Sequence, residues 1–151
     1  MNKTSKAMPQ AGNLDKVRVI DSRGTLPEIS IVEGAGWAKA VIWPGNGARY
    51  RTFQVINLEA GSSTRSLDHR TDSVYYVMRG AGVVQDVKGK TDEAIVEGSM
   101  IHIDAGDQYR IRASETGLEL LGGPCPADES WYSAETANES MSHEHPGLSP
   151  R

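Results

Sequence analysis

Residues Gly61–Gly80 read GSSTRSLDHRTDSVYYVMRG, and the second half of this stretch has the composition of a β-strand. The run VYYVM is rich in β-branched and aromatic residues, and a glycine follows it at a predicted turn. Side chains alternate between the two faces of a strand. If Ser73 faces the interior, Tyr75 and Val77 therefore face it too, and Tyr76 points away.

Short β-rich runs continue on both sides of this stretch, and none of them shows the period of a helix. Turn sequences rich in glycine, proline and aspartate separate them, such as WPGNG and DAGD. This spacing predicts an all-β domain with a closed or sandwiched antiparallel sheet. The expected strands are 17–20, 29–32, 37–43, 50–58, 74–78, 82–87, 94–96, 100–103, 109–112 and 118–121.

Length and composition fit a single domain with polar ends. The chain has 151 residues, of which 38% are hydrophobic, enough for one core. Both ends are polar and lack hydrophobic period. We therefore expect a flexible segment at 1–14, a β-domain at 15–133 and a flexible tail at 134–151.

Charge and cysteine content narrow the partners and the compartment. The net charge of -4 provides no basic field for nucleic acid or an anionic membrane surface. A single cysteine, Cys125, excludes an internal disulfide and favours a reducing environment. No apolar run approaches the roughly 20 residues of a membrane span, and the first ten residues lack a secretory signal. We expect a cytoplasmic protein.

The opening stretch resembles the first motif of the cupin superfamily, which has a glycine, five residues, His-x-His, a glutamate and a closing glycine. Gly61 and Gly80 match the two glycines, and His69 matches the second histidine. Leu67 stands at the first histidine position and Ser73 at the glutamate position. One of the three metal ligands of this motif is therefore present.

The stretch GSMIHIDAGDQYRIRA at 98–113 resembles the second cupin motif. Gly98 and Gly106 match, whereas Tyr109 stands where the family has its metal-binding histidine, and Asp104 and Ala113 replace a proline and an asparagine. The resemblance covers about residues 17–123. It implies a single-domain jelly-roll β-barrel, and also a homodimer, since cupins frequently pair through their N-terminal strands.

A barrel of this size holds one small ligand at its mouth. Alternation would line that pocket with the side chains around the motif positions. A first-row metal ion needs three or four nitrogen or oxygen ligands, and His69 alone does not supply them. We expect no cofactor. A divalent transition metal would need His69 together with Asp72 or His102.

Imidazole is the side chain whose ordinary pKa lies nearest neutrality, so His69 is the candidate general acid or base. Tyr75 and Tyr109 are candidate oxyanion donors. These three are the candidate catalytic residues for isomerisation, elimination, cyclisation or decarboxylation of a small oxygenated metabolite. The candidate substrate-binding residues are Ser73, Arg51, Leu67, Val77, Ile111 and His102, although Ile101 and Ile103 could claim the core face and leave His102 on the opposite one.

Two alternatives remain open at this stage. The pocket could bind a small molecule without changing it, or a rearranged ligand set around His69 could make a metal-dependent dioxygenase or hydrolase. Near the C-terminus, Trp131 and Tyr132 are expected to lie across the barrel or against a second subunit. Strict alternation along the strand at 37–43 would place Trp37 and Trp43 on one face.

Overall fold

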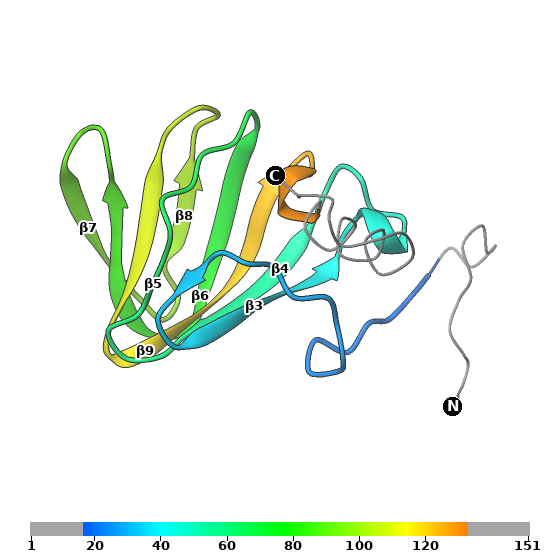
Figure 1. Cartoon of the computed structure of the whole chain (residues 1–151), viewed down its shortest axis with the longest axis horizontal. Helices are drawn as coiled ribbons and strands as arrows, with labels where there is room; N and C mark the ends of the chain where they lie inside the picture. The colour runs from blue at the N-terminus through cyan, green and yellow to red at the C-terminus, as the bar shows by residue number, and fades with distance from the viewer. Residues whose placement is uncertain (1–16, 133–151) are drawn as a thin grey trace, which may run out of the picture.

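The computed structural model describes residues 17–132, which form an eight-stranded antiparallel sheet that curves into a nearly closed barrel (Figure 1). The predicted terminal segments 1–14 and 134–151 lie outside the described residues. No helix within residues 17–132 is long and apolar enough to cross a membrane. With labels as in Figure 1, the strands are β2 (Val32–Glu33), β3 (Gly36–Ile42), β4 (Phe53–Leu58), β5 (Ser63–Thr64), β6 (Asp72–Asp86), β7 (Thr91–Val96), β8 (Met100–Ile103) and β9 (Tyr109–Cys125), with a 3-10 turn η1 (Pro44–Asn46) after β3.

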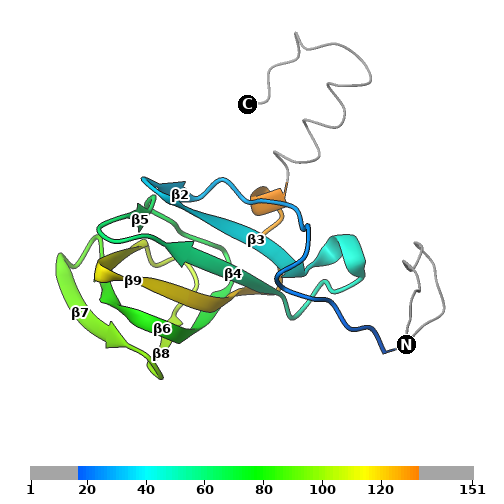
Figure 2. The same ribbon diagram turned by 90° about the horizontal axis from the view of Figure 1, so that it is seen from below.

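Two long strands, β6 and β9, hold the barrel together by pairing with each other along most of their length. The first part of β6 also pairs with β8, and its second part pairs with β7. Strand β9 pairs with β5 in its first part and with β4 in its second, and β4 pairs with β3. Seen from below, these strands surround a common interior (Figure 2).

Each long strand was expected as two shorter ones. The expected gap in β6 falls where the pairing with β9 shifts register between Val77 and Arg79 and again between Gly80 and Gly82. Gly80 has φ +88°, which glycine adopts without the strain that a Cβ causes. The glycine that closes the first motif therefore bends one continuous strand.

Residues 17–20 were expected to be a strand, and this expectation is wrong. They lie outside the sheet, with Val17 85% exposed and Val19 94% exposed. The sheet is joined further along the chain, where Glu28 pairs with Lys39 on β3. β-rich composition is insufficient where the chain lacks a neighbouring strand.

The interior of the barrel is filled by alternate side chains of the strands. The buried set comes from both sides of the barrel: Ile31, Ala40, Ile56, Leu58, Val77, Ile101, Ile103, Ile111, Leu118 and Leu120. A register shift between Ala40 and Ile42 interrupts the alternation of β3. As a result Trp43 packs on the core whereas Trp37 lies outside under Lys39, so the expectation that they share a face is wrong.

Candidate functional site

The four positions that correspond to cupin metal ligands lie together in the interior. Leu67, His69, Ser73 and Tyr109 are all buried, with Ser73 fully so. Backbone pairing brings the two motifs together, because Leu67 and Tyr109 exchange N–H···O bonds of 2.7 and 2.8 Å. Tyr75, two residues beyond Ser73 on β6, is also fully buried.

The polar side chains in this interior form one hydrogen-bonded chain. His69 Nε2 lies 2.8 Å from the hydroxyl of Tyr109, and that hydroxyl lies 2.6 Å from the hydroxyl of Tyr75. On its other side, His69 Nδ1 lies 2.5 Å from Oδ2 of Asp128. The four residues therefore connect a carboxylate, an imidazole and two phenols in sequence.

The direction of these hydrogen bonds follows from the charge of Asp128. Burial raises the pKa of its carboxyl, but hydrogen bonds from His69 and Ser130 outweigh burial and bring the pKa below its ordinary value of 3.8. A carboxylate only accepts hydrogen bonds, so we assign the proton of neutral His69 to Nδ1. Nε2 then accepts a hydrogen bond from Tyr109, whose oxygen accepts one from Tyr75.

Both phenols are held in the neutral form. Burial is the largest cause that raises the pKa of Tyr75 and of Tyr109 above the ordinary value of 10.0. The hydrogen bond from Tyr75 and the nearby hydroxyl of Ser73 oppose this rise at Tyr109 but do not cancel it. At neutral pH each tyrosine is therefore a hydrogen-bond donor.

The buried hydroxyl of Ser73 is not part of this hydrogen-bonded chain. It lies close enough to Tyr109 to lower the pKa of that phenol, yet its Oγ has no hydrogen-bond partner of regular geometry among the described residues. An unpaired buried hydroxyl is unfavourable. A bound ligand oxygen would satisfy it. Val77 and Ile111, both fully buried, add apolar side chains to this interior.

Asp128 reaches His69 from a segment that closes the barrel, residues 126–132, which we call the strap. Figure 1 shows it in orange after the end of β9. Trp131 packs edge-on against the His69 ring, with centroids 5.1 Å apart. Tyr132 donates to Gln54 Oε1 at 2.5 Å and stacks at 5.0 Å on Trp43. Trp131 and Tyr132 therefore lie across the barrel, as one of the two expectations had it.

Two candidate substrate-binding residues lie apart from this interior. Arg51 is exposed, and its guanidinium lies against the Tyr50 ring. His102 is also exposed, because Ile101 and Ile103 take the inward positions of β8. The structure thus places Ser73, Leu67, Val77 and Ile111 with the histidine and the tyrosines, and separates Arg51 and His102 from them.

The residues at the cupin ligand positions do not fit a metal ion. Leu67 has no donor atom, and both nitrogens of His69 are engaged by Asp128 and Tyr109. Tyr109 is a neutral phenol, which is a poor ligand. A transition ion here would have one or two ligands where three or four are needed.

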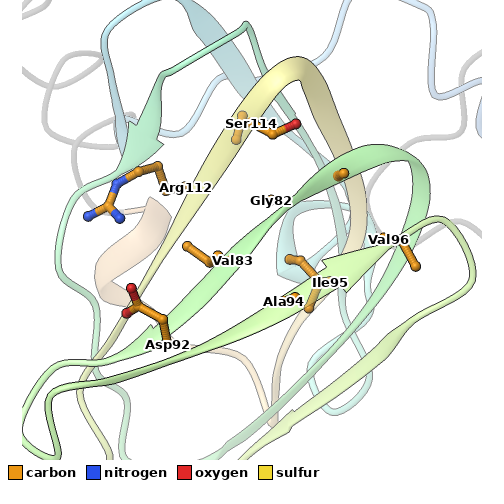
Figure 3. Close-up of a pocket in the computed structure, with 10 residues that line it drawn as sticks. Gly82, Val83, Asp92, Ala94, Ile95, Val96, Arg112 and Ser114 are labelled. Atoms are coloured by element: carbon orange, nitrogen blue, oxygen red, sulfur yellow. The ribbon is translucent and has the colours of Figure 1, made fainter.

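A separate hollow of about 360 Å³ lies at the other end of β6, away from these residues. Figure 3 shows side chains of β6, β7 and β9 around it, including Val83, Ala94 and Arg112. None of the candidate site residues lines it.

Because Asp128 is charged in the folded protein, the free energy of unfolding should decrease at low pH. The pKa of Asp128 is lower in the folded protein than its ordinary value of 3.8. The carboxylate therefore contributes to folding stability above pH 3.8, and this contribution is lost as pH falls through the pKa of the folded state. We expect Asp128→Asn to lower the free energy of unfolding by about 1 kcal/mol at neutral pH, with a smaller difference in acid. Urea unfolding at both pH values measures this. Glu129→Gln is the control, since Glu129 is exposed and loosely paired with Arg49; an equal pH-dependent loss in both variants would contradict the assignment.

The buried phenols should make stability fall in alkali. Burial raises the pKa of Tyr132 to about 12, although a hydrogen bond with Thr52 opposes the rise. Because the pKa of Tyr132 is higher in the folded protein, its neutral form contributes fully to stability below pH 10.0. That contribution is lost as pH rises toward 12. We expect the buried tyrosines to ionise only as the protein unfolds. Tyrosinate absorbance measures the ionisation, and circular dichroism measures the unfolding. Full ionisation of all tyrosines in a folded protein would be the opposite result.

No protein-family model matches the chain, and no curated protein sequence matches it. Solved structures do. A predicted oxalate decarboxylase from Thermotoga maritima is 24% identical with a TM-score of 0.61, over 73% of this chain and 100% of that one. A cupin-like protein from the same organism is 20% identical with a TM-score of 0.60, over 75% and 83%.

The polyketide cyclase RemF from Streptomyces resistomycificus is 14% identical with a TM-score of 0.61, over 79% of this chain and 93% of that one. Sequence identities this low indicate a shared fold but do not identify the reaction. Three observations agree on the fold: the glycine spacing of the two motifs, the jelly-roll pairing of β6 with β9, and these structural matches. The chain has the fold of the cupin proteins.

Proposed function

We propose that the protein is an enzyme that moves protons on a small oxygenated metabolite by general acid–base catalysis, without a metal ion in the barrel. The observation that carries this proposal is the chain Asp128–His69–Tyr109–Tyr75, with contacts of 2.5, 2.8 and 2.6 Å. A base oriented by a carboxylate and joined to a hydroxyl is an arrangement that supports proton transfer.

In the proposed step, Tyr109 stands between His69 and the substrate. Tyr109 gives its proton to His69 Nε2 while its oxygen takes a proton from the substrate. His69 becomes an imidazolium, which the carboxylate of Asp128 stabilises, and the electron pair stays on the substrate as an enolate-type oxyanion. The hydroxyl of Ser73 then donates a hydrogen bond to that oxyanion, and the hydroxyl of Tyr75 does so after it turns away from Tyr109. Return of the proton to another atom completes the reaction.

Proteins of the same fold support this choice of chemistry. Among the solved structures that the chain resembles are a polyketide cyclase and a predicted oxalate decarboxylase. Cyclisation of a polyketide can proceed through an enolate-type intermediate. The apolar side chains of Val77 and Ile111 favour a substrate with a compact carbon skeleton beside its carbonyl. Because Ser73 and Tyr75 are fully buried, the proposed reaction requires the strap to move away from the barrel to admit a substrate.

The test begins with a panel of small keto, hydroxy and enol acids and related carbonyl compounds, incubated with the full chain and followed by NMR. Conversion of at least one compound, in a reaction that depends on pH in the range where imidazole titrates, is the expected result. Recovery of a tightly bound compound that is never converted would instead support a binding module and contradict the proposal.

A further inference from the structure

The outside of the barrel carries a second group of side chains with metal-ligand chemistry. Asp72 at the start of β6, His102 on β8 and Asp104 just after β8 each offer one ligand atom, and these atoms all lie within 4.8 Å of one another. All three residues are exposed. The group is distinct from the buried His69 chain and from the cupin ligand positions.

The register of the sheet explains why these residues meet. Ser73 pairs with Ile103 and Val74 pairs with His102 across β6 and β8. Ser73 and Ile103 point into the core, so their neighbours point outward. Asp72 and Asp104 therefore fall opposite each other on the outer surface, with His102 diagonal to Asp72.

The arrangement places two carboxylates side by side without a lysine or arginine partner among the described residues. Like charges opposite each other on neighbouring strands are destabilising. Within residues 17–132, neither Asp72 nor Asp104 forms an ion pair with a lysine or arginine. A bound cation would remove this repulsion.

Hydrogen bonds already orient the side chains. Asp72 Oδ1 accepts from the backbone N–H of Ala105 at 2.9 Å, which leaves Oδ2 free. His102 Nε2 lies 3.0 Å from Asp104 Oδ1, so the imidazole and the carboxylate face each other, and a metal ion would replace the proton that they share.

We propose that Asp72, His102 and Asp104 bind one divalent transition-metal ion of the zinc, cobalt or nickel class, with water in the remaining positions. One imidazole nitrogen with two carboxylates suits such ions better than magnesium or calcium, which prefer oxygen alone. The ion joins the start of β6 to the turn between β8 and β9. Gly106 in that turn donates to the His69 carbonyl at 2.7 Å, so the ion also stabilises the loop that holds His69.

The experiment is a titration of the full chain with zinc, monitored by calorimetry, and with cobalt, monitored by paramagnetic broadening of backbone amide signals in NMR spectra. All variants in this experiment, including the reference protein called the parent, also carry His143→Gln and His145→Gln. These substitutions are needed because the His-Glu-His sequence at 143–145 could chelate zinc by itself. We expect one equivalent of zinc to bind, with broadening centred on residues 72 and 102–105.

Removing a ligand should weaken this binding strongly. His102→Gln and Asp104→Asn are each expected to reduce zinc affinity by at least about tenfold, since even outer-shell partners of a metal are worth about 10- to 100-fold. Asp107→Asn is the matched control, because Asp107 is an exposed carboxylate of the same turn outside the group; it should bind zinc as the parent does. Absence of stoichiometric binding, or equal affinity in the parent and His102→Gln, would overturn the proposal and leave the acid–base proposal untouched.

Discussion

Replacing His69 by glutamine is expected to reduce turnover by about 10²- to 10⁴-fold, the range over which a general acid or base contributes. Glutamine retains a polar side chain of similar reach but does not take up a proton at neutral pH. The contact with Asp128 and the packing against Trp131 make His69 a structural residue as well, so the variant should also lose some stability. Turnover is measured on the compound that the panel identifies, with folding checked by circular dichroism.

Two tyrosine variants separate a catalytic loss from a structural one. Tyr109→Phe keeps the buried ring and removes the hydroxyl that contacts both His69 and Tyr75, so it should lose activity nearly as far as the histidine variant. Tyr76→Phe is the control, because Tyr76 lies beside Tyr75 on β6 but is exposed on the outer face. Full activity in Tyr109→Phe, or equal losses in both variants, would contradict the proposed role of the chain.

Gly80→Ala is expected to have the largest effect on folding, at least about 3 kcal/mol of unfolding free energy or no folded protein at all. Gly80 has φ +88°, and a Cβ there would lie 2.1 Å from the carbonyl oxygen of Gly117. The Cβ would press the backbone of β6 against the backbone of β9 where the two strands pair with a register shift, so neither strand can move away without breaking the pairing.

Gly98→Ala provides the comparison. Gly98 has nearly the same backbone conformation, with φ +94°, but a Cβ there meets nothing within 4 Å. Only the strain of the left-handed conformation remains, about 1 kcal/mol. Thermal and urea unfolding of the two variants measure the difference. Equal destabilisation would show that the close approach of the two strands at Gly80 does not matter.

Much of the barrel could be predicted from alternation and glycine spacing. Ser73, Tyr75 and Val77 share the inward face and Tyr76 points out, as period-two alternation predicts. The same rule fails at Trp37 and Trp43, because a bulge at Ala40–Ile42 adds a residue that sequence pattern does not reveal. It also fails at residues 17–20, where strand composition occurs without a partner strand.

Asp128 is the site residue that sequence reasoning missed. It lies 59 positions from His69, in a polar segment with no motif, and its contact exists only because the strap folds back over the barrel. The one available signal was the pair Trp131 and Tyr132, whose bulk in a polar segment indicates a buried anchor nearby. The loss of metal ligands was visible in sequence, whereas the carboxylate that orients the remaining histidine required the closed fold.

The most direct test of metal-independent acid–base chemistry is deuterium exchange. The full chain is treated with a chelator, shown by elemental analysis to be free of transition metals, and incubated in deuterated water with the identified substrate. The account predicts that deuterium enters the substrate beside its carbonyl at the rate of the untreated protein, and that exchange disappears in His69→Gln. Exchange that stops on chelation and returns with added metal would contradict it.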